Sequence, residues 1–381
     1  MRPPRIAIDA TAIPRQMAGA GVYTYQLARA LAETPGEHRI VALARPGLFD
    51  DLAARCRRLH VVHADAKGRV GRLAWEQAVL PFLLRRLRID VLHSPHHHTP
   101  LAARGVRRVV TFHDVTFLLL KARYPLARRL YMEAVSRASA AAADAIIVPS
   151  RTVRDDVVRL LGVAPAQVVV IAEAPGTAYA PVEAQGELAR VRGRYRLPER
   201  YVLSVGSLEP GKNRGRLIRA YARLRSQGLA GGDCPLAIVG QPAWRYEGDF
   251  ELARRLELTE DVRFLGYVAD GDLPALYSGA TAFAFPSLYE GFGLPVLEAM
   301  ACGTPVLTSN VSAMTEVAGD AALLVDPLDT GAIADALGRL LSDATLREEL
   351  RARGLARAAE FSWERAARET LSIYEVVAAK D

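Results

Sequence analysis

Two halves of this chain begin in the same way, and this repetition constrains the fold more than any other feature. The runs "RIAIDA" (5–10) and "YVLSVG" (201–206) are short and apolar, and each leads into a loop and then an amphipathic helical pattern. Those helical patterns are "VYTYQLARAL" (22–31) and "RGRLIRAYARL" (214–224). Short strands that alternate with longer helices are typical of parallel sheets. The sequence therefore predicts an α/β fold with two Rossmann-like domains.

The domain boundary is expected near a stretch that contains Pro175, Pro181 and Pro198, which is typical of a linker. A chain of 381 residues is long enough for about two domains. We expect an N-terminal domain over 1–178 and a C-terminal domain over 196–362. Ligands of such sheets bind beyond the carboxyl ends of the strands, so the two domains are expected to face a central cleft.

Charge is divided unevenly between the two halves. Residues 1–180 hold 26 Lys and Arg against 14 Asp and Glu, and the remainder holds 23 against 28. Basic clusters lie at 55–58, 85–88 and 104–108. Either these are solvated faces of an arginine-rich chain, or they attract an anionic membrane or substrate. No zinc finger or RNP-like segment accompanies them, so nucleic acid is not an expected partner.

Apolar runs and cysteines indicate the compartment. The longest apolar runs are too short to span a membrane, and Asp9 interrupts the stretch that a signal peptide would keep apolar. Cys56, Cys234 and Cys302 are far apart and form no CxxC pair, which is typical of reduced, inert thiols. We expect a cytoplasmic protein, peripheral on the inner face of the membrane if the basic half binds there.

The segment "YEGFGLPVLEAM" (289–300) places two carboxylates on either side of a glycine-bearing turn. It follows "ATAFAFPS" (280–287), which is typical of a buried strand, and Pro295 suits the first turn of a helix. Gly293 lets backbone amides approach a ligand, and the helix N-terminus favours an anion such as phosphate. We expect Glu298 in the first helical turn, bound to ribose hydroxyls, and Glu290 bound to sugar hydroxyls. The alternative is an ordinary turn with a glutamate that the helix dipole stabilises.

This segment, as E-G-F-G-L-P-x-L-E-A-M-A-C-G-T-P-V, resembles the signature of the retaining GT-B glycosyltransferases of family 4. Five further segments resemble the family in the expected order: "GAGVYT" (19–24), "TFHD" (111–114), "VGSLEPGKN" (205–213), "VRFLGYV" (262–268) and "FSW" (361–363). The last resembles the start of a helix, expected over 363–381, that crosses back to the first domain. The resemblance implies a GT-B fold.

The resemblance also implies roles for individual residues. His113 and Glu290 are the implied catalytic residues, in contact with the transferred sugar. The implied donor-binding residues hold the diphosphate, the ribose or the sugar: Gly21, Gly206, Ser207, Lys212, Phe292, Gly293, Leu294 and Glu298. A leaving nucleoside diphosphate gains negative charge, which fixed cations and amide dipoles stabilise without a metal.

The implied activity is a retaining, metal-independent hexosyl transfer from a nucleotide sugar to an acceptor hydroxyl, in surface polysaccharide or glycolipid assembly. The donor is expected to be a GDP- or UDP-sugar and the acceptor a sugar or lipid-linked sugar, with no cofactor. "IAEAPG" (171–176) resembles a branch assigned to mannosyl or rhamnosyl transfer. Many relatives carry arginine where Ser207 or Gly211 stands, so Lys212 acts with backbone dipoles alone or with Arg214. The alternatives are a non-catalytic nucleotide-sugar-binding protein and a transferase for a small soluble acceptor.

The loop "HSPHHHTP" (93–100) concentrates histidines. Three consecutive side chains do not converge easily on one ion, and no cysteine or carboxylate joins them at ligand spacing, so no metal site is predicted. We expect His96, His97 and Asp114 on the acceptor side, and the alternative is solvated or hydrogen-bonded imidazoles. A nicotinamide dehydrogenase is not predicted, because "GAGVYT" lacks the third glycine and does not directly follow a strand.

Overall fold

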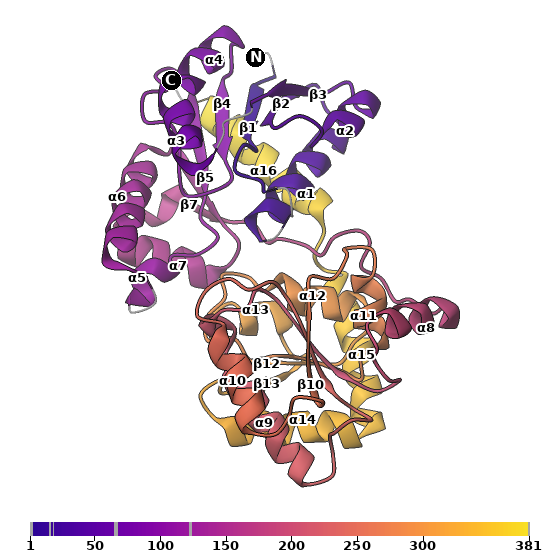
Figure 1. The fold of residues 1–381 in the computed structure, drawn as a ribbon. Coiled ribbons are helices and arrows are strands. Elements are labelled where there is room, and N and C mark those ends of the chain that lie inside the picture. The colour runs from indigo at the N-terminus through magenta and orange to yellow at the C-terminus, as the bar shows by residue number, and fades with distance from the viewer. Residues whose placement is uncertain (1–2, 15–16, 18, 65–67, 122–123, 380–381) are drawn as a thin grey trace. The chain divides into compact units, whose positions relative to one another are not determined.

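The computed structural model describes residues 3–14, 17, 19–64, 68–121 and 124–379, and the chain forms two compact units (Figure 1). Unit 1 comprises Met1–Glu173 with Ser362–Asp381, and unit 2 comprises Ala174–Phe361. Each unit contains one parallel sheet with helices around it.

The sheet of unit 1 has seven parallel strands in the order β3-β2-β1-β4-β5-β6-β7. The strands are β1 (Arg5–Asp9), β2 (Arg39–Ala44), β3 (Leu59–His63), β4 (Val91–Ser94), β5 (Arg107–Thr111), β6 (Ala145–Val148) and β7 (Val168–Val170). The order reverses between β1 and β4, which is the switch point of a Rossmann fold. Loops after β1, β4 and β5 therefore lie at the ligand-binding edge of the sheet.

Eight helices of unit 1 are described: α1 (Ala20–Glu33), α2 (Asp50–Arg55), α3 (Gly68–Ala78), α4 (Leu80–Arg86), α5 (Thr116–Leu119), α6 (Leu126–Ala142), α7 (Arg151–Leu161) and α16 (Trp363–Ala378). Ser362 caps α16 by accepting a hydrogen bond from the Arg365 amide at 3.1 Å. The face of α16 that carries Trp363 and Tyr374 is buried, and Tyr374 Oη lies 2.6 Å from His93 Nδ1 of β4. The C-terminal helix thus packs on the first sheet. The last two residues of the expected helix 363–381 lie outside the described residues.

The sheet of unit 2 repeats the plan with six strands in the order β10-β9-β8-β11-β12-β13. The strands are β8 (Val202–Val205), β9 (Leu236–Val239), β10 (Val262–Gly266), β11 (Ala282–Phe285), β12 (Val306–Ser309) and β13 (Leu323–Val325). The helices are α8 (Gln185–Arg194), α9 (Arg214–Ser226), α10 (Glu247–Arg255), α11 (Leu273–Gly279), α12 (Leu294–Ala301), α13 (Met314–Ala318), α14 (Thr330–Ser342) and α15 (Ala344–Ala358). The expected fold class, two Rossmann-like α/β domains, is confirmed.

The proline-bearing stretch that was expected to link the domains is partly helical. Residues 185–194 form α8, which packs within unit 2. Arg190 and Arg194 each form an ion pair with the buried Asp272, at 2.8 and 2.9 Å. Prolines indicate where regular secondary structure is interrupted, but they do not show whether the residues between them form a helix or a linker. Residues 174–195 therefore belong to unit 2, although the sequence placed them outside the second domain.

Candidate active site

The loop after β8 carries three of the predicted donor-binding residues. Gly206 follows β8 directly and has a φ of 142°, a conformation that favours glycine. A Cβ added to Gly240 would lie 1.8 Å from the Gly206 carbonyl oxygen, so the turn depends on two glycines in close approach. Ser207 is exposed, and Lys212 ends a short 3₁₀ turn, Pro210–Lys212, just before α9. This places the lysine and the exposed loop backbone at the carboxyl edge of the second sheet.

Lys212 and Glu290 form an ion pair. Lys212 Nζ lies 2.7 Å from Glu290 Oε1 and 3.0 Å from Oε2, although 78 residues separate the two in sequence. Both side chains are largely buried, and Ser287 Oγ donates a further hydrogen bond of 2.5 Å to Glu290 Oε1. The sequence assigned these two residues to different parts of a donor. The structure brings them into direct contact, so each neutralises the other.

The turn into α12 has the geometry that an anion site requires. Gly293 has a φ of 107°, a conformation that favours glycine, and a Cβ there would lie 2.1 Å from Met314 Cε, which would have to move. Leu294 is the first residue of α12, and its amide has no acceptor within the helix; Pro295 has no N–H, and the Val296 amide donates to the Gly293 carbonyl oxygen at 2.9 Å. Phe292 is buried, and its ring lies 5.9 Å from that of Phe361. The side chain of Phe292 is therefore structural, and its backbone remains the part available to a ligand.

Glu298 does not lie where the sequence placed it. Because α12 begins at Leu294, Glu298 is in the second turn, and no acidic residue occupies the first turn. The helix dipole acts mainly within the first turn, so it does not explain this glutamate. The expectation of a first-turn position was wrong, although Pro295 does lie in the first turn as expected, because Glu298 is the fifth residue of the helix.

Two tyrosines hold Glu298. Tyr277 Oη donates to Glu298 Oε2 at 2.9 Å, and Tyr179 forms a second hydrogen bond with the carboxyl group. Burial raises the pKa of Glu298 to about 7, and the two hydroxyls oppose that rise only in part. A carboxyl group with this pKa both donates and accepts hydrogen bonds near neutral pH, which suits contact with a diol. Neither tyrosine was predicted, because nothing local in the sequence links them to this helix.

Gly21 lies in the first turn of α1 in unit 1. A Cβ at Gly21 would lie 3.3 Å from Pro14 Cδ, which is tighter than an ordinary contact. Gly19, the residue that precedes α1, has a φ of 50°. Gly21 thus lets Pro14 lie close to the first turn of α1. This end of α1 is the position that the sequence assigned to a phosphate.

Both ring nitrogens of His113 are engaged within unit 1. Nδ1 lies 3.0 Å from Glu173 Oε1, and Nε2 lies 3.1 Å from the Pro95 carbonyl oxygen. Burial lowers the pKa of His113, but the hydrogen bond and the charge of Glu173 outweigh it and raise that pKa above its usual value. Two acceptors require two donated protons, so His113 is an imidazolium here. Glu173 lies in "IAEAPG", and its partner could not be identified from sequence.

The predicted acceptor-side residues form local hydrogen bonds. His97 Nε2 lies 2.9 Å from His98 Nε2, and burial lowers the pKa of His97 to about 4 and that of His98 to about 2. His96 Nε2 lies 3.6 Å from Asp9 Oδ2. Asp114 Oδ1 accepts from the amide and hydroxyl of Thr116 at 2.8 and 2.6 Å, which shapes the start of α5. The imidazoles of His97 and His98 are therefore neutral near neutral pH and are polar, uncharged hydrogen-bonding groups.

A buried pair of carboxylates adjoins this loop and was not predicted. Asp9 ends β1 and is fully buried; burial raises its pKa, but His96 and Thr11 lower it more. Glu76 is also fully buried and lies 3.1 Å from Arg72 Nη1, and burial raises the pKa of Glu76. The one feature of the sequence that could have indicated this pair is an acidic residue, Asp9, at the end of the first buried strand. Among the residues that the structure describes, no group of three His, Cys, Asp or Glu side chains is arranged to hold a metal ion.

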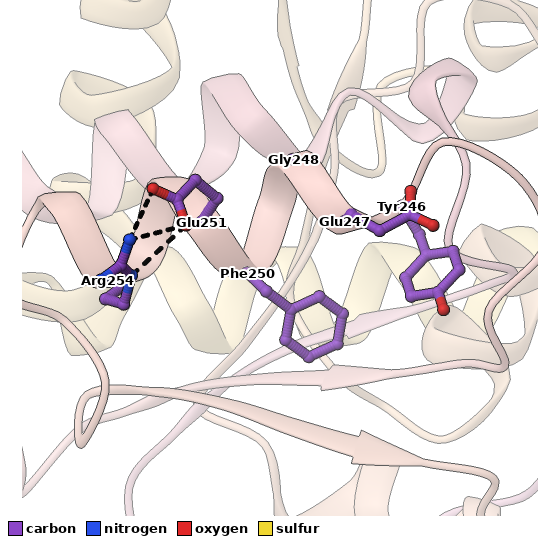
Figure 2. Close-up of a pocket in the computed structure, with 6 residues that line it drawn as sticks. All are labelled: Tyr246, Glu247, Gly248, Phe250, Glu251 and Arg254. Atoms are coloured by element: carbon purple, nitrogen blue, oxygen red, sulfur yellow. Dashed lines mark hydrogen bonds and ion pairs between the residues drawn. The ribbon is translucent and has the colours of Figure 1, made fainter.

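A surface groove lies elsewhere, beside α10. Figure 2 shows its lining residues, with Glu251 and Arg254 ion-paired at 2.9 Å on the same helix. Phe250 stacks on Phe264 of β10 with ring centroids 4.0 Å apart. None of the six residues in Figure 2 is a predicted site residue.

Two Rossmann-like units, with a lysine and two glutamates at the ligand edge of the second, define the class of GT-B glycosyltransferases. The family described as glycosyl transferases group 1 matches residues 189–357, and glycosyltransferase family 4 matches residues 17–173. The chain belongs to these family 4, group 1 glycosyltransferases and is a glycosyltransferase.

Named relatives agree with this assignment. O-antigen chain mannosyltransferase B of Escherichia coli is 37% identical over 295 residues, which cover 77% of this chain and 76% of that protein. Serotype-specific mannosyltransferase WbdA of E. coli is 31% identical over 91% of this chain, but the chain spans only 44% of its length. Anabaena HepE, solved with UDP-glucose, superposes with a TM-score of 0.77 at 18% identity, covering 98% of this chain and all of that one.

Within the described residues, no helix is both long and apolar enough to cross a bilayer.

Proposed function

We propose that this glycosyltransferase transfers a hexose, with mannose as the first candidate, from a GDP- or UDP-sugar to a hydroxyl group of a growing surface glycan. Two relatives are named as mannosyltransferases, and one is named for the O-antigen chain. HepE was solved with UDP-glucose, which supports a nucleotide-sugar donor. The observation that carries the proposal is the contact of Lys212 with Glu290 beside the N-terminus of α12.

In this proposal unit 2 binds the donor. Lys212 and the loop backbone at Gly206 and Ser207 bind the diphosphate, and Glu298 binds the ribose diol. Glu290, with the amides of Phe292 to Leu294, binds the sugar. When the diphosphate binds, it replaces Glu290 as the ion-pair partner of Lys212. The carboxylate is then free to accept hydrogen bonds from sugar hydroxyls.

The chemistry proposed is transfer with retention, in which the leaving diphosphate gains negative charge and the fixed cations and amides stabilise it without metal or cofactor. His113 acts on the sugar as a hydrogen-bond donor: a sugar hydroxyl replaces the Pro95 carbonyl oxygen as the acceptor of the Nε2 proton, while Nδ1 stays bonded to Glu173. The polar loop that carries His96 and His97 binds the acceptor together with Asp114. Glu173 is a positioning residue that keeps His113 protonated.

A thermal-shift panel tests the donor. The protein is heated with UDP, GDP, dTDP or ADP and with the matching sugar nucleotides, and transfer to a mannose-terminated acceptor is measured with the best of them. A ligand at a hundred times its dissociation constant raises the free energy of unfolding by about 2.7 kcal/mol. One nucleotide is expected to exceed the others. If a nucleotide sugar binds but is neither transferred nor hydrolysed, the protein is a binding protein and not a transferase.

For the acceptor, we propose a lipid-linked glycan at an anionic membrane, approached through the basic unit 1. The α4 helix supports this. Phe82 is 72% exposed, Val79 lies one turn before it, and Arg85 and Arg86 are exposed beside them. Apolar and cationic side chains on one exposed helix suit the interface of an anionic bilayer.

A further inference from the structure

Arg214 is the largest fully buried side chain of the protein, although it is charged. It is the first residue of α9, directly after Asn213, whose φ of 57° turns the chain into the helix. The guanidinium reaches back beneath the loop after β8. Nη1 donates to the Ser207 carbonyl oxygen at 2.6 Å, and Nη2 donates to the Gly206 carbonyl oxygen. The side chain is only 1% exposed.

The positive charge of Arg214 has no counter-ion within the described part of the chain. Its contacts are two neutral carbonyl groups, no described carboxylate lies within ion-pair distance, and Nε has no hydrogen-bond partner. Burial lowers the pKa of Arg214 to about 10, and the more distant charges of Asp249, Glu209 and Glu290 oppose this only in part. Arg214 therefore remains charged at neutral pH. A buried charge without a partner is strongly unfavourable, which requires an explanation.

Arg214 lies against the same glycine as Lys212. A Cβ added to Gly206 would be 3.5 Å from Arg214 Nη2 and 3.6 Å from Lys212 Cε. Glu290 neutralises Lys212, but it makes no ion pair with Arg214. Lys212 is thus ion-paired in the unliganded protein, whereas Arg214 is a cation beside this loop that no described carboxylate contacts.

The two carbonyl contacts also orient the loop backbone. In a trans peptide the N–H points opposite to the carbonyl group of the same peptide unit. Since the Gly206 carbonyl points down to Arg214, the Ser207 N–H points away from it, on the side where Ser207 is exposed. An anion at that amide would meet a hydrogen-bond donor with a buried cation behind it.

We propose that Arg214 is the buried counter-ion of the donor diphosphate and acts through the loop that it supports. This rests on the proposed function, because it assigns a further residue to the same donor site. Low polarizability around the guanidinium strengthens its field at the loop surface. The diphosphate supplies the negative charge that the unliganded protein lacks at this position. Because the loop separates Arg214 from the ligand, Arg214 does not contact the diphosphate. It acts by positioning the loop backbone and by its positive charge.

The test uses Arg214→Gln, which keeps an N–H donor for the loop carbonyls but removes the charge, and Arg214→Lys, which keeps the charge. Arg219→Gln, on the exposed side of α9, is the matched control. Calorimetry measures the dissociation constant of the nucleoside diphosphate that the parent binds best. Ligand-observed NMR measures that of the corresponding uncharged nucleoside. Circular dichroism confirms that each variant is folded.

We expect Arg214→Gln to weaken diphosphate binding by about tenfold or more, as for a lost charge-assisted contact, with nucleoside affinity within about twofold of the parent. Arg214→Lys and Arg219→Gln are expected to bind the diphosphate within a few-fold of the parent. Unchanged diphosphate affinity in a folded Arg214→Gln, or an equal loss for nucleoside and diphosphate, overturns the proposal. If Arg214→Gln does not fold, the test rests on a folded Arg214→Lys. A tenfold loss of diphosphate affinity in that variant, which keeps the positive charge, excludes a role for the charge. A parent protein that binds no nucleoside diphosphate instead overturns the proposed function.

Discussion

Replacing Glu298 with glutamine is expected to change how the stability of unit 2 depends on pH. The native carboxyl group has a pKa of about 7, against a usual value of 4.5. Between these values the native state holds a proton that the unfolded state has lost, so the free energy of unfolding falls as pH rises from about 4.5 to above 7. At 1.36 kcal/mol per pKa unit, the loss amounts to about 3 kcal/mol.

Glutamine cannot ionise, so the free energy of unfolding of Glu298→Gln should not fall in this way as pH rises. Its side-chain oxygen can still accept the hydrogen bond from Tyr277. Relative to the parent, the variant should gain about 3 kcal/mol in its free energy of unfolding between pH 4.5 and pH 8. Other titrating groups affect both proteins alike and cancel in the difference. Hydrogen exchange of peptides from β8 and α9, followed at increasing urea concentration, reports the unfolding of unit 2. The matched control is Glu348→Gln, an exposed glutamate on α15 that should show no such gain. If Glu298→Gln and the parent respond identically to pH, the carboxyl group is ionised in the native protein and the argument is wrong.

Four other expectations concern ligand binding and activity. Lys212→Ala should weaken nucleoside diphosphate binding by about tenfold or more, as a charge-assisted contact is worth roughly 1.5 to 3 kcal/mol; unchanged affinity in calorimetry would place the diphosphate elsewhere. Glu290→Gln should weaken binding of the sugar nucleotide but spare the bare nucleotide, whereas Glu298→Gln should weaken both, and equal losses of the bare nucleotide would contradict this division. His113→Ala should lower turnover by about a hundredfold and leave nucleoside diphosphate binding nearly intact, which steady-state transfer and calorimetry measure together; parent-like turnover would remove His113 from the mechanism. Sedimentation with acidic vesicles should fall as salt rises and fall further in Phe82→Ser, while equal binding to neutral vesicles would argue against an anionic membrane.

The sequence by itself determined the fold class and the location of the main loops. Strand and helix periodicity are local properties, so the repeated pattern at "RIAIDA" and "YVLSVG" was sufficient to predict two parallel sheets. Gly293 and Pro295 also predicted the turn into α12 from local information, since their backbone preferences act within one or two residues. Glu298 lies just beyond the first turn in which it was expected, because helix starts depend on capping as well as on composition.

Tertiary structure alone decided which polar groups meet. Lys212 faces Glu290 across 78 residues of sequence, and His113 faces Glu173 across 60. These contacts form because parallel strands deliver the loops at their carboxyl ends to one edge of a sheet, and no local pattern encodes which loops become neighbours. Burial is decided in the same way. The sequence offered Arg214 as one possible partner of Lys212 at the diphosphate, but only the packing of α9 beneath the β8 loop makes it a buried cation.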